Sequence, residues 1–183
     1  MRVIAGEFRS RVLKSVPGLD TRPTPDRLRE ALFSALGPRV QDAVFADLYA
    51  GTGAVGLEAL SRGARRALFV EHHRHAVGVI RDNLKTLGIE DRADVKQAKA
   101  SAINVEADIV FVDPPYDLAN EYSLCLEALG RGASSLVLVQ HDKRQKLKGQ
   151  YGRLTQTRVM RQGDNCISFY TADLYISDPP EAR

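Results

Sequence analysis

From residue 43 onward the chain alternates short apolar runs with longer segments whose apolar residues recur at helical spacing. The runs at 43–48, 67–70, 93–98, 109–112 and 136–139 predict strands, and the segments at 55–62, 75–87 and 121–129 predict helices between them. Strands that alternate with helices form a parallel sheet with crossover helices. Two further strand-like runs, 153–161 and 166–171, have no helix between them, which predicts an antiparallel hairpin at the end of the sheet.

The first 38 residues carry a different pattern. Residues 1–14 alternate weakly between apolar and polar positions, which predicts a short basic hairpin or arm. Thr24 is a good N-cap and Pro25 fits the first helical position, and apolar residues at helical spacing follow until a Gly-Pro pair ends the helix. We therefore predict two parts: residues 1–38, a basic hairpin and first helix that pack on the core, and residues 39–183, the α/β core.

Composition excludes several classes of protein. The chain has 183 residues, 44% of them hydrophobic, as expected for one ordinary globular domain. No window approaches the roughly 18 apolar residues of a membrane span, and the N-terminus lacks the apolar segment of a secretory signal. We therefore expect a cytoplasmic protein without a membrane partner.

Charge is unevenly distributed, although the formal net charge is only +3. Four basic residues stand against one acid over 2–14, and seven stand against one acid over 140–161. Clustered Lys and Arg indicate a polyanionic partner such as a nucleic acid. A solvated loop explains the basic run 143–148 equally well.

The tetrapeptide Asp113-Pro114-Pro115-Tyr116 follows the apolar run 107–112. Two prolines remove backbone donors and force the chain out of the sheet. An acid, a pair of unused proline carbonyls and an aromatic ring are then expected at the carboxyl end of a strand, where open α/β sheets bind ligands. The acid and a carbonyl can accept hydrogen bonds from an NH2 group, and the ring can stack on a base. The pattern predicts methylation of an exocyclic amino group; a rigid strand exit is the alternative.

A glycine-rich loop follows the first predicted strand. Gly51, Gly53 and Gly56 match G-x-G-x-x-G, and Glu71 ends the next strand twenty residues after Gly51, which also fits a nicotinamide enzyme. Asp47 at the mouth of the loop would repel a pyrophosphate but could hold the ammonium group of S-adenosylmethionine. Glu71 could accept both ribose hydroxyls. We therefore favour S-adenosylmethionine as cofactor; Gly56 has the alternative role of permitting close helix packing.

Other residues near the loop are weaker candidates for cofactor contacts. Tyr49 and Thr52 lie in the loop, and Tyr49 could form a wall of the pocket. His72 follows Glu71 and could line the adenine pocket, although a solvated helix start is an equal alternative. His72, His73 and His75 have no Cys or carboxylate cluster beside them at ligand spacing, so we predict no metal site.

Together these motifs resemble class I S-adenosylmethionine-dependent methyltransferases with a (D/N)PP(Y/F) motif. More narrowly, the chain resembles the RsmD-type enzymes that methylate guanine N2 of small-subunit (16S) ribosomal RNA. The residues that carry the narrower match are Arg2-Val3-Ile4-Ala5-Gly6, Thr21-Arg22-Pro23-Thr24-Pro25-Asp26-Arg27-Leu28-Arg29-Glu30-Ala31-Leu32-Phe33, the segment from Asp47 to Ala64, and Phe111-Val112-Asp113-Pro114-Pro115-Tyr116.

The resemblance implies a Rossmann-like sheet of seven strands, mostly parallel with the last strand antiparallel, and a small N-terminal hairpin and helix extension. It implies cofactor contacts at Asp47, Gly51, Gly53 and Glu71, and catalysis at residues 113–116. It further implies that the basic N-terminal segment helps to grip ribosomal RNA, either naked or within a small ribosomal subunit. The expected RNA contacts are Arg2, Arg9, Arg11, Lys14 and Arg22.

One departure concerns adenine recognition. Similar enzymes often place Asp or Asn after the third strand, whereas this chain has Gln97-Ala98-Lys99-Ala100. Because a lysine cannot accept a hydrogen bond, a backbone group or Gln97 is expected to meet the adenine amino group instead. Three alternative functions stay open: a DNA adenine-N6 methyltransferase, a nicotinamide-dependent oxidoreductase, and a non-catalytic RNA-binding module.

Overall fold

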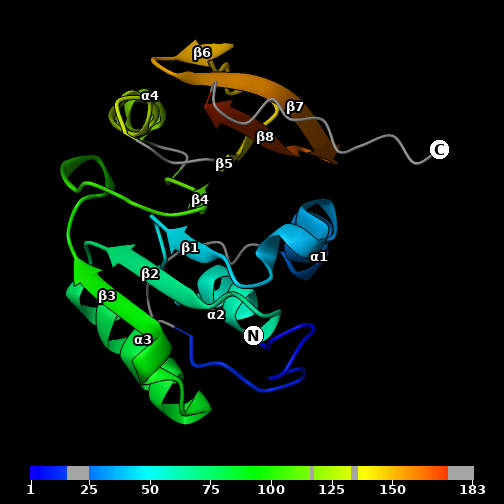
Figure 1. Ribbon diagram of the computed structural model, residues 1–183, viewed down its shortest axis with the longest axis vertical. Coiled ribbons are helices and arrows are strands. Elements are labelled where there is room, and N and C mark those ends of the chain that lie inside the picture. The colour runs from blue at the N-terminus through cyan, green and yellow to red at the C-terminus, as the bar shows by residue number, and fades with distance from the viewer. Residues whose placement is uncertain (16–24, 116–117, 133–135, 173–183) are drawn as a thin grey trace.

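One mixed sheet forms the centre of the molecule (Figure 1). The computed structural model describes residues 1–15, 25–115, 118–132 and 136–172. Within them the strands are ordered β3-β2-β1-β4-β5-β8-β7-β6. Their bounds are β1 (Val44–Asp47), β2 (Arg66–Glu71), β3 (Ala93–Gln97), β4 (Ile109–Val112), β5 (Leu136–Asp142), β6 (Gln150–Tyr151), β7 (Leu154–Gln162) and β8 (Asn165–Ala172).

Strand directions confirm the predicted class of fold. Strands β1 to β5 are mutually parallel, and β8 runs antiparallel to both β5 and β7. The sheet has eight strands rather than seven because the two-residue β6 adds an antiparallel edge beside β7. The chain moves outward from β1 to β3 and then returns to β4 on the other side of β1, so the strand order reverses between β1 and β4. Open α/β sheets bind ligands in the crevice at such a reversal.

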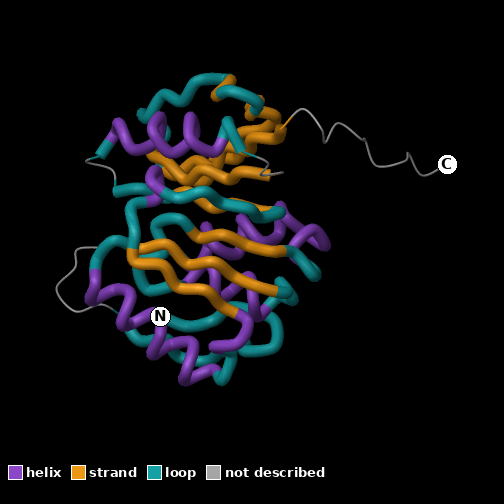
Figure 2. Tube along the Cα trace, turned by 60° about the vertical axis from the view of Figure 1, so that its left-hand side comes forward, coloured by secondary structure: helices purple, strands orange, loops and turns teal. Residues whose placement is uncertain are grey.

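Helices cover both faces of the sheet (Figures 1 and 2). On one face, α1 (Asp26–Leu36), α2 (Ala54–Ser61) and α3 (Arg74–Leu87) share a hydrophobic cluster with alternate residues of the strands. On the other face, α4 (Ala119–Leu129) packs into a second cluster. Short 3-10 turns complete the described chain: η1 (Gly37–Val40), η2 (Glu90–Arg92) and η3 (Ala100–Ala102). No helix in the described part of the chain is long and apolar enough to cross a membrane.

The N-terminal arm, residues 1–15, is less regular than the predicted hairpin. Its two ends pair through an antiparallel bridge between Arg2 and Val12 and through backbone hydrogen bonds from the N–H groups of Val3, Ser10 and Leu13 to the carbonyls of Arg11, Val3 and Met1. The arm bends at Gly6, whose φ is +85°. A full ladder does not form because several arm N–H groups bond to α2 instead. Val3 and Leu13 of the arm are buried in the same hydrophobic cluster as residues of α1, α2, α3 and the sheet. The predicted boundary at residue 38 between an N-terminal part and the α/β core stays a prediction.

Candidate functional site

The glycine-rich loop leaves β1 at the reversal of strand order and leads into α2. Its backbone is tied to both neighbouring strands, because the Leu48 N–H donates to the Phe111 carbonyl and the Ala50 N–H to the Val70 carbonyl. Gly51 and Gly53 have φ of 53° and 80°, in the left-handed region that favours glycine. The loop therefore needs these two glycines to turn from strand to helix.

Asp47, the last residue of β1, is 2% exposed. Its Oδ2 accepts a hydrogen bond of 3.1 Å from the Gly56 N–H. Burial raises the pKa of this carboxyl to about 7, the bond from Gly56 opposes the shift, and the charge of Glu71 adds to it. A desolvated carboxylate at this position is a strong acceptor for a ligand cation.

Glu71 ends β2 and is held rigidly by the backbone around it. Its Oε2 accepts from the Gly51 N–H at 2.9 Å and its Oε1 accepts from the His73 N–H at 2.8 Å. The structure thus brings the loop glycine and the acid together, as the spacing of the motif suggested. Each carboxylate oxygen has a further lone pair that can accept from a hydroxyl group.

Gly56 serves close packing between α2 and β2. A Cβ at this position would lie 2.3 Å from Cε1 of Phe69. This contact supports the alternative role that the sequence left open for the third glycine of the motif.

Tyr49 links the loop to α4. Its hydroxyl donates to Glu121 Oε2 at 2.9 Å, and burial raises the pKa of the phenol. The Glu121 partner was missed from the sequence because the two residues are 72 positions apart.

The backbone of Thr52 is held by a buried asparagine, Asn83 of α3. Asn83 Nδ2 donates to the carbonyls of Thr52 at 3.1 Å and Lys14 at 3.2 Å, and Oδ1 accepts from the Lys14 N–H at 2.8 Å. One side chain therefore fastens both the cofactor loop and the end of the arm. A polar residue between the buried Ile80 and Leu84 was the signal that sequence reasoning passed over.

His72 lies at the rim of the site, with its side chain 48% exposed and its Nδ1 3.4 Å from Glu71 Oε1. Gln97 Nε2 donates to the His72 carbonyl at 3.4 Å, so the two adenine-pocket candidates are neighbours. Glu71, His72 and His73 also offer ligand atoms within 4.8 Å of one another, a geometry that could hold a metal ion. Both Glu71 oxygens already accept backbone N–H groups there.

Asp113 follows β4 at the same edge of the sheet as the loop. Strand β4 lies directly beside β1, with Phe111 opposite Asp47. Pro114 is buried and Pro115 is exposed. The prediction of two unused proline carbonyls was wrong for Pro115, whose carbonyl accepts from the Leu118 N–H at 3.0 Å. Tyr116 lies outside the described residues.

The expected RNA-binding residues are exposed where the structure describes them. Arg2, Arg9, Arg11 and Lys14 are all exposed on the arm. Lys14 Nζ makes an ion pair of 2.8 Å with Asp82, in which both side chains are more than half exposed. Arg22 lies outside the described residues.

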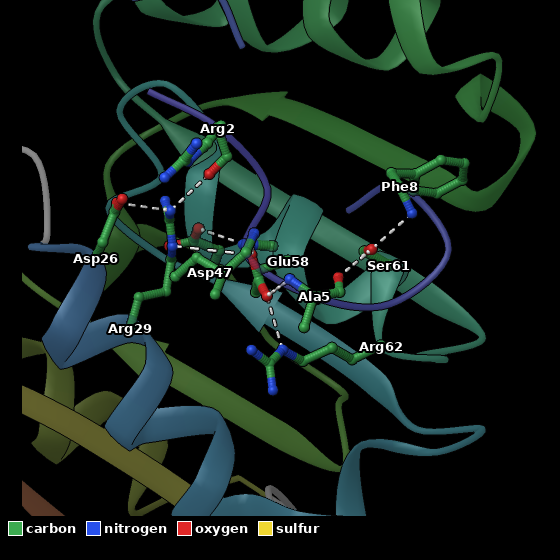
Figure 3. A network of polar contacts seen from close by, with 11 residues as sticks. Arg2, Ala5, Phe8, Asp26, Arg29, Asp47, Glu58, Ser61 and Arg62 are labelled. Atoms are coloured by element: carbon green, nitrogen blue, oxygen red, sulfur yellow. Dashed lines mark hydrogen bonds and ion pairs between the residues drawn. The ribbon is translucent and has the colours of Figure 1, made fainter. Parts of the chain in front are cut away.

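A buried acid on α2 anchors the arm (Figure 3). The Glu58 carboxylate, 0% exposed, accepts from the N–H groups of Ile4 and Ala5 at 2.8 and 3.0 Å. It also accepts from Arg62 Nε at 2.7 Å and lies 3.9 Å from Arg29 Nε. The arm is therefore attached to α2, the helix that follows the glycine-rich loop.

A cavity of about 360 Å³ lies away from these residues. Its lining includes Val44 and Arg66, the first residues of β1 and β2, and Asp94 and Lys96 on β3. Because the glycine loop lies at the opposite ends of these strands, this cavity is not the predicted cofactor site.

Comparison with known proteins gives a consistent picture. A family model described as conserved hypothetical protein 95 matches residues 1–171. The Bacillus subtilis protein YlbH, provisionally named an rRNA methyltransferase, is 33% identical over 186 residues, which cover 93% of this chain and 98% of the relative. Ribosomal RNA small subunit methyltransferase D of Escherichia coli (strain K12) is 40% identical over 119 residues, 63% of this chain and 60% of the relative. Among solved structures, yhhF from Escherichia coli, provisionally called a methyltransferase, matches with a TM-score of 0.83 and 31% identity, covering 94% of this chain and 97% of that one.

Proposed function

The chain belongs to the family described as conserved hypothetical protein 95, the RsmD-type family that its motifs resemble, and we propose that it methylates the exocyclic N2 of a guanine in small-subunit ribosomal RNA. The cofactor is S-adenosylmethionine, which supplies an electrophilic methyl group when bound. The observation that carries the proposal is the shared sheet edge at which the glycine loop, the buried Asp47 and Asp113 meet.

The residues present fit this cofactor. Asp47 offers a desolvated carboxylate to the ammonium group, and the amides at the start of α2 can receive the methionyl carboxylate. Glu71 is oriented by two backbone N–H groups and has lone pairs for the ribose hydroxyls. Tyr49, Thr52 and His72 complete the proposed set of cofactor contacts.

The proposed chemistry relies on positioning. An aromatic amino group is a poor nucleophile, because its lone pair is delocalised into the ring. Hydrogen bonds from its two protons to the Asp113 carboxylate and the Pro114 carbonyl favour a pyramidal nitrogen with its lone pair aimed at the donor methyl. Pro115 fixes the strand exit, and Tyr116 stacks on the base. Catalysis is then mainly orientation and electrostatics, and Asp113 is available to take the released proton.

The basic arm is the proposed grip on RNA. Exposed Arg and Lys side chains neutralise phosphates and release counterions, which makes affinity depend on salt. Arg2, Arg9, Arg11 and Lys14 supply these charges from the arm, and Arg22 is proposed to join them. A base inside a duplex cannot reach the sheet edge, so the target guanine has to be unpaired or flipped out.

Labelled methyl transfer tests the proposal. Naked ribosomal RNA, assembled small subunits and duplex DNA are offered separately, and the methylated base is identified by mass spectrometry. Transfer to guanine N2 is expected in at least one RNA substrate. Incorporation into DNA alone would overturn the proposal in favour of a DNA methyltransferase, and binding of a nicotinamide dinucleotide without S-adenosylmethionine would favour an oxidoreductase.

The Asp113→Ala variant tests the catalytic assignment. It is expected to lose transfer while its Kd for S-adenosylmethionine stays within about threefold of the wild type, because Asp113 faces the base and not the donor. Glu106→Ala is the matched control, since Glu106 is an exposed acid that precedes the same strand. Turnover retained in Asp113→Ala would refute the assigned role.

Neutralising Arg9, Arg11 and Lys14 tests the RNA grip. The triple variant is expected to have a higher KM for RNA. The slope of the logarithm of its RNA-binding constant against the logarithm of salt concentration should also be shallower, by the contribution of up to about three phosphate contacts. Unchanged salt dependence would mean that the arm does not contact RNA.

A further inference from the structure

A buried glutamine, Gln140, lies beside Asp113 on the neighbouring strand. Strands β4 and β5 pair in parallel up to Val112 opposite Val139, so Asp113 and Gln140 are the next residues on their strands. Neighbouring strands lie about 4.8 Å apart, which makes these two residues adjacent at the carboxyl edge of the sheet.

The two side chains share a face of the sheet. Val112 and Val139, which precede them, belong to the hydrophobic cluster on the α4 face. Because side chains alternate along a strand, Asp113 and Gln140 project to the opposite face. Asp47 projects to that face as well, since its preceding residue also belongs to the α4 cluster. The three side chains therefore form a row across β1, β4 and β5, with the cofactor loop at one end and Gln140 at the other.

Gln140 is the first polar residue of β5 and follows four apolar residues, Leu136 to Val139. It is 4% exposed, and within the described residues its Oε1 has no hydrogen-bond partner. A buried amide carbonyl without a donor is costly, and a leucine there would continue the pattern of the strand without that cost. An unsatisfied acceptor beside the proposed amino-group clamp points to a donor supplied by the substrate.

Resting on the proposed function, we propose that Gln140 reads the target base, with its Oε1 accepting the N1–H of the guanine whose N2 is held by Asp113. In guanine a ring N–H donor lies next to the exocyclic amino group. In adenine and cytosine the corresponding ring nitrogen is an acceptor, which would face the Gln140 carbonyl unfavourably. Gln140 Nε2 can at the same time donate to O6 of guanine. This residue gives the Asp-Pro-Pro-Tyr tetrad the base preference that its own chemistry lacks.

The test removes the paired groups from the base and from the side chain in turn. Once the methylated position has been mapped, the target guanine is replaced by 2-aminopurine, which keeps the exocyclic 2-amino group but has neither N1–H nor O6. The enzyme is used as wild type, as Gln140→Met, which keeps the length of the side chain without its amide, and as Gln140→Glu, which keeps an acceptor. For each pair, kcat/KM is measured together with the Kd for S-adenosylmethionine.

The wild type is expected to prefer guanine over 2-aminopurine by about tenfold or more, because a site built to hydrogen-bond a group rejects the analogue that lacks it. Gln140→Met is expected to lose most of that preference through a lower kcat/KM on guanine alone, with an unchanged Kd for S-adenosylmethionine. Gln140→Glu is expected to keep the preference for guanine.

Two results would overturn the inference. One is an equal kcat/KM of the wild type for guanine and 2-aminopurine, a result that does not depend on whether any variant folds. The other is a Met variant whose preference for guanine equals that of the wild type. A wild type that transfers no methyl group to guanine N2 in any RNA would instead refute the proposed function, so the two failures are distinguishable.

Discussion

Replacement of Asp47 by Asn should make the ligand-free protein more stable at neutral pH while removing its cofactor affinity. The amide is nearly isosteric and can still accept from the Gly56 N–H, but it carries no charge. Burial raises the pKa of Asp47 from 3.8 to about 7, so its ionised form is disfavoured in the folded protein. About three pKa units at 1.36 kcal/mol each correspond to about 4 kcal/mol of unfolding free energy.

The sign follows from proton binding. Between about pH 4 and pH 7 the folded protein holds a proton on Asp47 that the unfolded chain releases, so the stability of the wild type falls as pH rises through this window and levels off above it. The Asn variant lacks this contribution. The difference in unfolding free energy, variant minus wild type, should therefore grow by about 4 kcal/mol between pH 4 and pH 8.

Urea denaturation without ligand at several pH values measures this difference. Asp82→Asn is the control, since Lys14 lowers the pKa of the exposed Asp82 and the corresponding difference should slope in the opposite direction. Binding of S-adenosylmethionine by the wild type should tighten as pH rises toward 7, whereas the Asn variant should bind weakly at every pH. A flat difference curve for Asp47→Asn would mean that water reaches this carboxylate and would refute the reasoning.

Three further predictions concern the framework around the site. Glu58→Ala removes the acceptor of two arm N–H groups and of Arg62 Nε, together with the negative charge 3.9 Å from the buried Arg29. Its Tm in a circular dichroism melt should therefore fall by about 10 °C, whereas Lys14→Ala, which removes an exposed ion pair, should shift Tm by about 2 °C or less. Equal shifts would contradict the role of Glu58. Asn83→Leu removes the hydrogen bond to the Thr52 carbonyl and should raise the Kd for S-adenosylmethionine about three- to tenfold in calorimetric titration. Asp82→Ala changes a neighbouring residue and should leave this Kd unaffected. An unchanged Kd for Asn83→Leu would show that the loop keeps its conformation without Asn83. Gly56→Ala places a methyl group 2.3 Å from the Phe69 ring and should lower the unfolding free energy measured in urea by about 1 to 3 kcal/mol. Gly78→Ala, where a Cβ meets nothing within 4 Å, should leave that free energy unchanged or raise it. Similar results for both variants would argue against close packing at Gly56.

The sequence predicted those parts of the fold that local pattern determines. The run Ile109 to Val112 became β4 without any shift of its ends, because apolar residues fill it and prolines stop it. The spacing from Gly51 to Glu71 predicted that both residues belong to one site, and the structure places them in contact, because a β-strand, turn, helix and β-strand unit has a nearly fixed length. The predicted hairpin of the arm is present only in a short form, since residues 1–3 pair with residues 10–13 while the N–H groups of Ile4 and Ala5 bond to α2.

The residues that sequence reasoning missed depend on contacts between distant segments. Glu58 and Asn83 bond to arm residues 54 and 69 positions away, and no local period reports such a partner. Both residues nevertheless interrupt apolar helix faces, which is a readable sign of a buried polar role. Gln140 likewise follows the apolar residues 136–139 of β5, and only the sheet register shows that it stands next to Asp113.

The attachment of the arm to Glu58 and Asn83 also bears on how the chain is made. Translation delivers residues 1–14 before α2 and α3, and the hydrogen-bonding partners of Ile4, Ala5 and Lys14 on these helices are added more than fifty residues later. Until these helices have been made, the N–H groups of Ile4, Ala5 and Lys14 can bond to water but not to their native acceptors. These arm residues are thus made well before the side chains that they contact, and a nascent chain that stops before residue 83 has no side chain to receive Lys14.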